Sequence, residues 1–64
     1  MWYPTRRQVI VNTKTGRAFR GVLWRAGLRY MVLRQAEMLG GEPVAMDGEV
    51  LIARGNVDFV QVID

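Results

Sequence analysis

The sequence predicts an all-β fold: a small, strongly bent antiparallel barrel of five strands. Three features of the 64 residues predict it. Apolar and polar residues alternate through most of the chain, which is the periodicity of half-buried strands. β-Branched and aromatic residues fill these segments, and glycine-containing breaks separate them at short intervals. Short strands joined by tight turns, without a convincing long helix, indicate one sheet curled into a small barrel.

The five strands are expected at 8–13, 17–25, 28–39, 49–54 and 57–63. Asp47-Gly48 predicts a hairpin turn before the fourth strand, because Asp-Gly suits the left-handed conformations of such turns. Residues 1–7 form an extension that contains Pro4 and has room for a turn at most, so the sequence predicts a reduced or absent N-terminal helix. The whole chain, 1–64, is expected to be one domain whose barrel spans 8–63.

Two positions in the strands require an explanation. Gly21 lies in the middle of the second strand, where glycine usually marks a sharp bend or the close approach of another backbone. The segment 35–39 would suit a helix, whereas 30–33 prefers a strand. We interpret all of 28–39 as one long bent strand, because it lies between two glycine breaks in an otherwise all-β chain.

The size of the chain favours self-association. A domain this small buries only about 60% of the surface that its unfolded chain exposes, so it usually needs further stabilisation. Cysteine and histidine are absent from the sequence, which excludes disulfides and an ordinary zinc site. The border strands of a small sheet are also a liability unless they pair. We therefore expect the last strand of one copy to pair with the fourth strand of the next and so to close a ring.

The charge is unevenly distributed along the chain. Residues 1–34 carry eight basic side chains and no acid, a charge of +8, whereas 35–64 carry one arginine and six acids, a charge of −5. Three interpretations remain open. The charges are solvated on the polar faces of strands, or they steer neighbouring copies together, or the basic half binds a polyanion.

The residue types argue against an enzyme. The chain has no histidine or cysteine, no nucleophile motif, no phosphate-binding glycine loop and no carboxylates paired at helical spacing. We expect no catalytic residue, no metal site, no cofactor, no small-molecule substrate and no membrane span. Among the aromatic residues, Phe19 and Phe59 are expected in the core. Trp24 is expected to be partly exposed, either at a subunit interface or stacked on a base.

Two short segments are candidates for binding single-stranded RNA. Arg29 and Tyr30 follow the turn at Gly27, and an arginine beside an aromatic ring can sandwich a nucleobase. Arg54, Gly55 and Asn56 combine a phosphate-binding or stacking group, a small residue that permits close approach, and an amide that can read a base edge. An ordinary strand tyrosine and a plain corner turn explain the same residues, so both interpretations stay open.

Two stretches of the chain resemble the sequence motifs of the Sm and Sm-like proteins. The first motif matches VIV at 9–11, GRAFRGVL at 16–23, MVL at 31–33 and AE at 36–37. The second motif matches VLIARGNVDFV at 50–60. The resemblance covers nearly the whole barrel and implies the Sm-like fold, which is of the SH3-like barrel class. It also implies a ring of five to eight copies that binds uridine-rich or other single-stranded RNA near the central pore.

The sequence departs from the family pattern where the base is recognised. Gly27 stands in place of the loop aspartate, and Tyr30 or Met31 stands in place of the base-reading asparagine. The second motif is one residue short, so only Arg54, Gly55 and Asn56 carry over. These departures weaken the implied uridine pocket and leave the implied fold intact.

Two functions therefore remain: an RNA-binding ring that uses Arg29, Tyr30, Arg54, Gly55 and Asn56, and a structural or adaptor ring whose partner is a protein. The compact form and the segment 41–50 resemble short Sm-like proteins encoded by bacteriophages. Eight arginines to one lysine fit a GC-rich genome. The expected location is the cytoplasm, that of the bacterial host if a bacteriophage encodes the chain.

Overall fold

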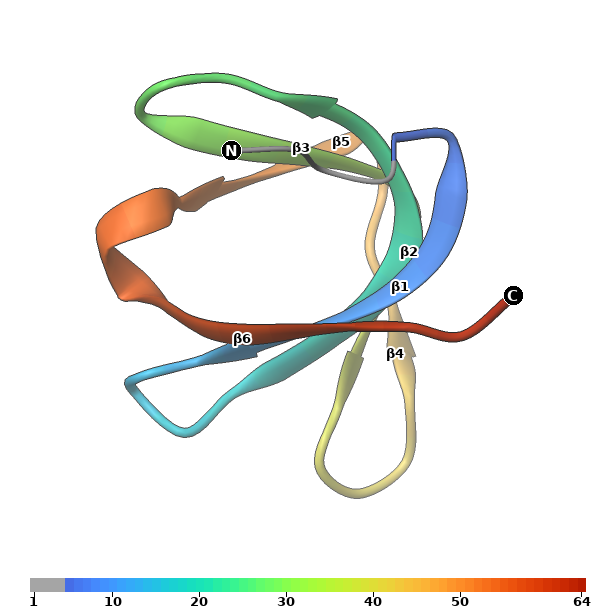
Figure 1. Ribbon diagram of the computed structural model, residues 1–64. Helices are drawn as coiled ribbons and strands as arrows, with labels where there is room; N and C mark the ends of the chain where they lie inside the picture. The colour runs from blue at the N-terminus through green and yellow to red at the C-terminus, as the bar shows by residue number, and fades with distance from the viewer. Residues whose placement is uncertain (1–4) are drawn as a thin grey trace.

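The computed structural model describes residues 5–64 as one strongly curled antiparallel sheet (Figure 1). Its elements in chain order are β1 (Arg7–Thr13), β2 (Ala18–Ala26), β3 (Tyr30–Leu39), β4 (Val44–Ala45), β5 (Glu49–Ala53), the 3-10 turn η1 (Arg54–Asn56) and β6 (Val57–Val62). The predicted all-β fold is confirmed, and the strand ends agree with the predicted ones within about two residues. The segment 35–39 is strand, as predicted, rather than helix.

The strands pair in the order β4-β3-β2-β1-β6, and β5 also pairs with β3. The first half of β3 lies against β5, from Tyr30 opposite Ala53 to Arg34 opposite Glu49. The second half of β3 lies against β4, with Glu37 opposite Ala45. β4 and β5 are thus two segments of one strand that follows β3, which makes the five strands of the predicted barrel.

The predicted hairpin at Asp47-Gly48 is wrong. β4 and β5 both run antiparallel to β3, so the chain keeps its direction through residues 46–48. The reversal occurs earlier, between β3 and β4, where Gly40 and Gly41 have φ angles of 114° and 145°. Gly48 does have a positive φ of 72°, and here that conformation bends a strand instead of reversing it.

A bulge opposite Gly21 bends the sheet. The register between β2 and β3 shifts between Arg20 and Val22. On the facing strand, Gln35 has a φ of 51°, in the left-handed region that L-residues rarely adopt. A Cβ atom on Gly21 would lie 2.9 Å from the Arg34 carbonyl oxygen and 3.1 Å from the Cα of Ala36. Gly21 therefore permits a close approach of the two backbones, as its place in the strand predicted.

The concave face of the sheet holds the core, which consists of Val9, Val11, Leu23, Met31, Leu33, Ala36 and Ile52. Phe19 is partly buried and packs against this cluster, in agreement with the prediction. The prediction for Phe59 is wrong, because its side chain is 53% exposed. Phe59 lies opposite Asn12 on the outer face of the sheet, whereas Val60 lies opposite the buried Val11.

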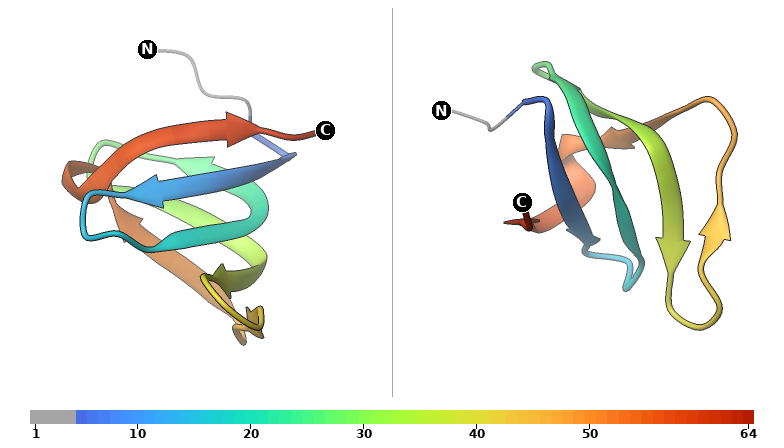
Figure 2. Two further views of the ribbon diagram at one scale, coloured as in Figure 1. Left: turned by 90° about the horizontal axis from the view of Figure 1, so that it is seen from below. Right: turned by 90° about the vertical axis from the view of Figure 1, so that its right-hand side faces the viewer.

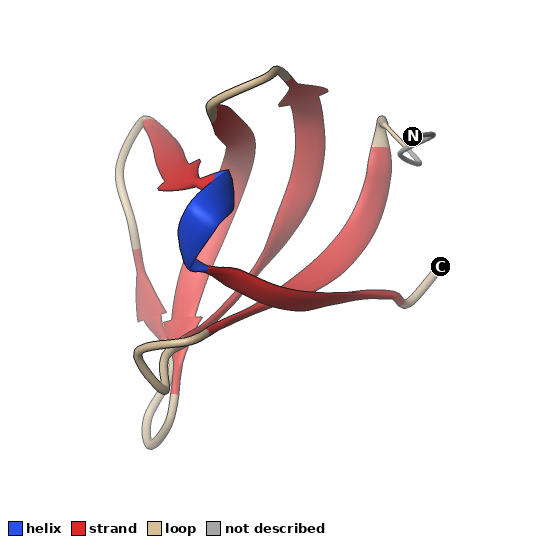
Figure 3. Cartoon of the chain, turned by 60° about the vertical axis from the view of Figure 1, so that its left-hand side comes forward, coloured by secondary structure: helices blue, strands red, loops and turns tan. Residues whose placement is uncertain are grey.

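The sheet does not close on itself. β5 and β6 are at opposite ends of the pairing order, and η1 connects them across the gap (Figure 3). One side of each of these strands pairs with no other strand in residues 5–64. The β3–β4 hairpin extends beyond the rest of the sheet, as both views of Figure 2 show.

The N-terminal extension is described from Thr5 onward. Thr5 and Arg6 form a turn that leads directly into β1, and Arg6 has a φ of 64°. The first four residues of the predicted extension lie outside the described part of the chain. Across residues 5–64, no helix is long and apolar enough to cross a membrane.

Candidate nucleic-acid interface

η1 brings two distant turns together at one end of the molecule. The backbone N–H of Arg54 donates to the carbonyl of Arg29 in the β2–β3 turn, at 2.8 Å. The N–H of Lys14 in the β1–β2 turn donates to the carbonyl of Asn56, also at 2.8 Å. In Figure 1 both turns and η1 lie on the left-hand side, with η1 between them. The short 3-10 turn therefore determines which loops share a surface.

Four of the five predicted RNA-binding residues lie around the β2–β3 turn. Nη1 of Arg54 donates to the carbonyl oxygen of Gly27 at 2.9 Å, which clips η1 to this turn. Tyr30 begins β3, lies opposite Ala53 and is half exposed. Arg29 is exposed beside it, and Gly55 follows Arg54 in η1. The structure thus brings Arg29, Tyr30, Arg54 and Gly55 together.

The fifth predicted residue, Asn56, lies on the other side of η1. Its Nδ2 donates to Oγ1 of Thr15 in the β1–β2 turn, at 3.4 Å. Thr13 closes that same turn. Its Oγ1 accepts from the backbone N–H of Arg17 at 3.1 Å, and its hydroxyl donates to the Arg17 carbonyl at 2.9 Å. Asn56 therefore belongs to the β1–β2 side of the surface and is separated from Tyr30.

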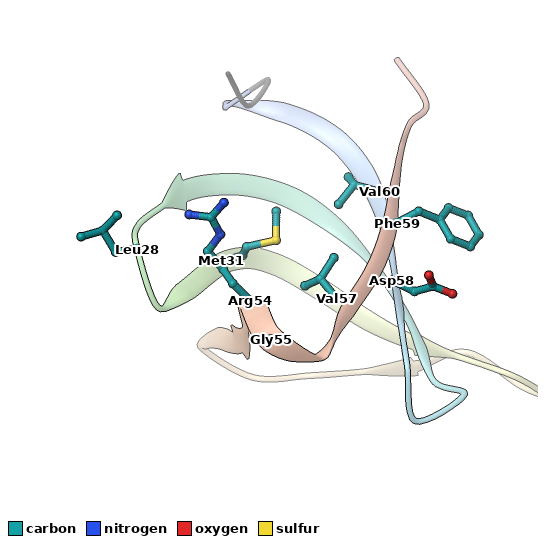
Figure 4. Close-up of a pocket in the computed structure, with 8 residues that line it drawn as sticks. All are labelled: Leu28, Met31, Arg54, Gly55, Val57, Asp58, Phe59 and Val60. Atoms are coloured by element: carbon teal, nitrogen blue, oxygen red, sulfur yellow. The ribbon is translucent and has the colours of Figure 1, made fainter. Parts of the chain in front are cut away.

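A hollow of about 590 Å³ lies where the sheet is open between η1, β6 and the β2–β3 turn. Its lining residues are Leu28, Met31, Arg54, Gly55, Val57, Asp58, Phe59 and Val60. In Figure 4 the side chains of Met31, Val57 and Val60 point into the hollow, whereas Asp58 and Phe59 point away from it. Leu28 stands on the β2–β3 turn and is 93% exposed, so the rim is apolar as well as basic.

Two further cations join this surface and were missed among the predicted site residues. Lys14 and Arg17 are exposed in the β1–β2 turn, and neither forms an ion pair with another residue of 5–64. The Lys-Thr-Gly-Arg sequence showed a basic turn, but only the bond from Lys14 to η1 places it beside Arg54. We call Lys14, Arg17, Arg29 and Arg54 together the basic end.

Elsewhere the basic and acidic halves of the chain pair with each other. Arg20 forms an ion pair with Glu37, and its Nε lies 2.7 Å from Oε1 of that residue. Nε of Arg34 lies 2.7 Å from Oε2 of Glu49. These pairs follow from the register, which sets each arginine opposite its glutamate on the adjacent strand.

A third pair ties the last residue of the chain to β1. Arg7 Nε lies 3.2 Å from Oδ1 of Asp64. The backbone N–H of Gln8 donates to the Asp64 carboxylate, and together with Arg7 it holds the pKa of Asp64 below its usual value. Both interactions stabilise the ionised carboxylate.

Trp24 lies on the outer face among arginines. The guanidinium carbons of Arg6 and Arg34 lie over its ring, 3.8 and 4.0 Å from the centroid. Each such contact is a cation–π interaction. The side chain is partly buried, as predicted, and the ring contacts arginines of its own chain. Because these arginines already occupy the ring, Trp24 is a poor platform for a base.

No protein-family model and no curated protein sequence matches the chain. Solved structures do match. A heptameric archaeal Sm protein superimposes with a TM-score of 0.81 at 23% identity, over 92% of this chain and 88% of that protein. The P. aerophilum SmAP1 heptamer gives the same TM-score and identity, over 92% of this chain and 81% of that one.

A third similar structure is a chain of the NatC complex, crystallised with CoA bound. It superimposes with a TM-score of 0.79 at 21% identity, over 92% of this chain and 78% of that one. At identities this low, the likeness establishes how the strands are arranged and not what the protein binds. With a curled five-stranded sheet, a bend at Gly21 and a 3-10 turn before the last strand, the chain has the Sm fold.

Proposed function

We propose that the chain assembles into a closed ring of identical copies and that the ring binds single-stranded RNA at its basic end. The observation that carries the proposal is the open seam of the sheet, where β5 and β6 each have an unpaired side. A free strand edge presents unused N–H and C=O groups and is a template for pairing with another chain. Two different edges on one molecule form a heterologous contact, which gives a ring when the rotation closes.

The hydrogen bonds within the chain identify the groups available on each edge. The N–H of Arg54 points to β3, so the backbone groups of Ile52 and Val50 also point there, and those of Leu51 point outward. The N–H of Ile63 donates to Gln8 in the direction of β1. By the same alternation, Val62 and Val60 direct their backbone groups outward from β6.

Exposed apolar side chains accompany these edges. Leu51 of β5 is 60% exposed, and Phe59, Val62 and Ile63 at the other edge are each close to half exposed. At about 25 cal/mol per Å² of apolar surface, covering such side chains favours association. Pairing β5 of one copy with β6 of the next would cover both edges together and add the stability that a chain of this size otherwise lacks.

The test of the ring is Leu51→Pro, with Leu51→Ala as the matched control. Proline removes an N–H that no bond within the chain uses, and it is tolerated on edge strands. Both variants remove the exposed leucine, but only proline removes the outward donor. We expect the wild type and Leu51→Ala to form a single large species by light scattering. Leu51→Pro should be monomeric by the same measurement and folded by circular dichroism. A wild type that is monomeric at high concentration refutes the ring.

The RNA-binding part of the proposal rests on the basic end. Lys14, Arg17 and Arg29 are exposed and have no ion pair within residues 5–64, and Arg54 joins the two turns that carry them. A ring repeats this group once per copy, which concentrates positive charge and attracts phosphates. Each phosphate that such a group neutralises releases counterions and strengthens binding at low salt. The proposed activity involves no catalytic step.

The binding test is a titration with labelled single-stranded RNA at 50 and 200 mM salt. Arg29→Gln and Lys14→Gln should each weaken binding and reduce the dependence of log K on log salt by about 0.7, the value for one phosphate contact with a single strand. A matched control is Arg20→Gln, because Arg20 is already paired with Glu37. Absence of binding at 50 mM salt refutes the RNA-binding proposal and leaves the ring.

A second candidate is an adaptor ring whose partner is a protein. The observation that favours it is the apolar rim of the hollow, where Leu28, 93% exposed, lies with Val57 and Val60; contiguous apolar surface is typical of sites that dock a protein. The likeness to a chain of the NatC complex supports the same candidate. Affinity capture discriminates between the two, since an adaptor returns a defined protein that Leu28→Ser loses, and an RNA-binding ring returns RNA.

We also propose that the chain is encoded by a bacteriophage and acts in the cytoplasm of its bacterial host. The compact sequence and the preference for arginine over lysine, eight to one, support this origin. Detection of the protein in the soluble fraction of infected bacteria, and not in uninfected ones, tests it.

A further inference from the structure

We infer that the RNA-binding site of the basic end selects its ligand by base stacking and phosphate charge, and reads neither base edges nor the ribose. The inference rests on the proposed function and specifies its ligand class: single-stranded nucleic acid, RNA and DNA alike, with adenine preferred to uracil. Its basis is how the β2–β3 turn uses its polar groups.

Several backbone groups of the turn form hydrogen bonds within the chain. The N–H of Gly27 donates to the carbonyl of Tyr30 at 2.9 Å, and the carbonyl of Gly27 accepts from Arg54 Nη1 at 2.9 Å. The carbonyl of Arg29 accepts the backbone N–H of Arg54 at 2.8 Å. These bonds fix the shape of the turn, and they occupy the N–H of Gly27 and one lone pair of each carbonyl.

The side chains of the turn offer no substitute. Residues 26–30 are Ala, Gly, Leu, Arg and Tyr, with no amide, carboxylate or aliphatic hydroxyl among them. Asn56 of η1 is directed away from this turn, because its Nδ2 donates to Thr15 on the other side of η1. The guanidinium of Arg54 is engaged with Gly27. Side chains that pair a donor with an acceptor, as needed to distinguish one base from another, are therefore missing around Tyr30 in the described chain.

What remains exposed at the turn suits stacking and charge. Tyr30 is 50% exposed, and its neighbour Arg29 is exposed as well. Every base has a π face, so stacking on an aromatic ring tolerates any sequence, and preferences then follow stacking strength. A purine offers a larger face than a pyrimidine, which favours adenine over uracil. Telling RNA from DNA requires contacts to the 2′-hydroxyl, for which this turn has no dedicated group.

The experiment compares four labelled oligonucleotides of one length, oligo-A, oligo-U, oligo-dA and oligo-dT, by fluorescence anisotropy with the full chain. Oligo-A should bind several-fold more tightly than oligo-U, and oligo-A and oligo-dA should agree within about threefold. Tyr30→Ala should weaken binding of each oligonucleotide about 5- to 150-fold, the range for losing one stacked base. Tyr30→Phe is the matched control, since it keeps the ring without the hydroxyl and should bind as the wild type does.

Each outcome has a separate meaning. If none of the four binds at 50 mM salt, the RNA-binding proposal fails. If oligo-U binds tenfold more tightly than oligo-A, or RNA tenfold more tightly than DNA, the inference is overturned while the RNA-binding proposal stands. Unchanged binding by Tyr30→Ala also overturns it, because the stacking platform is then elsewhere. Equal weakening by Tyr30→Phe and Tyr30→Ala overturns it as well, since the hydroxyl would then be read.

Discussion

Replacing Gly21 by alanine tests the account of how the sheet bends. The added Cβ would lie 2.9 Å from the Arg34 carbonyl oxygen, 3.1 Å from Ala36 Cα and 3.2 Å from Ala36 Cβ. Two of these atoms are backbone, and the bulge at Gln35 fixes their positions, so a side-chain rotation cannot relieve the contact. Overpacking of this kind costs about 1–3 kcal/mol. Alanine also restricts the unfolded chain, which stabilises the folded state by about 0.4–1 kcal/mol. The free energy of unfolding should therefore fall by about 1–2 kcal/mol in all.

The measurement is urea unfolding followed by circular dichroism, with thermal unfolding alongside. For a domain of this size, 1 kcal/mol corresponds to about 4–8 °C in Tm, so Gly21→Ala should melt about 4–16 °C below the wild type. The matched control is Gly55→Ala, because a Cβ there meets no atom within 4 Å. All samples need one protein concentration, since association shifts apparent stability. A Gly21→Ala protein as stable as Gly55→Ala would show that the two strands do not approach closely, and would refute the bend.

Three further predictions concern the outer face and the chain ends. In a double-mutant cycle, Trp24→Ala and Arg6→Gln should show a coupling of about 0.5–1 kcal/mol in the free energy of unfolding, the value for an exposed cation–π pair; additive effects would contradict the contact. Gln35→Gly should raise stability by about 0.5–1 kcal/mol, because it relieves a φ of 51°, whereas Gln35→Val should lower it, as measured by urea unfolding. In an NMR pH titration, the carboxyl of Asp64 should titrate below its usual pKa, and Arg7→Gln should move the midpoint up. Because the pKa of Asp64 is lower in the folded protein, its carboxylate stabilises the fold at pH values above the unfolded pKa. This stabilisation disappears as the pH falls through the folded pKa. An unchanged titration midpoint in Arg7→Gln would exclude the pairing.

The sequence predicted the strands because local pattern and fold agree there. In β2, for example, residues two apart share a face, and Gly21 and Leu23 are both buried. The same pattern, bounded by glycines, favoured strand over helix at 35–39 although the local residues suit a helix. It could not locate the chain reversal, since Asp47-Gly48 and Gly40-Gly41 both carry turn chemistry. The choice depends on β4 and β5 both pairing with β3, which is a non-local property.

The exposure of Phe59 and the placement of the candidate site residues on two sides of η1 could not be predicted, for a similar reason. Both faces of β6 carry apolar residues, so its sequence does not say which face is buried. The register with β1, including the irregularity between Asn12 and Thr13, decides that Val60 faces the core and Phe59 faces out. In the same way, Arg54 and Asn56 are two residues apart in sequence, but η1 directs one to the β2–β3 turn and the other to the β1–β2 turn. A 3-10 turn separates such neighbours by about 240°, which a motif written in letters does not show.

The strand register changes the interpretation of the charge difference between the basic first half and the acidic second half of the chain. Antiparallel pairing sets Arg20 opposite Glu37 and Arg34 opposite Glu49, so much of the contrast is cancelled within each copy. Exposed pairs of this kind stabilise the fold by at most about 1 kcal/mol each, so their main effect is on the electrostatic field. With those acids paired, Lys14, Arg17 and Arg29 at the turns of the basic end have no ion pair within residues 5–64. The net charge of +3 is therefore weighted toward loops that η1 holds together. This arrangement favours a polyanion as the partner of that end over the complementary half of a neighbouring copy.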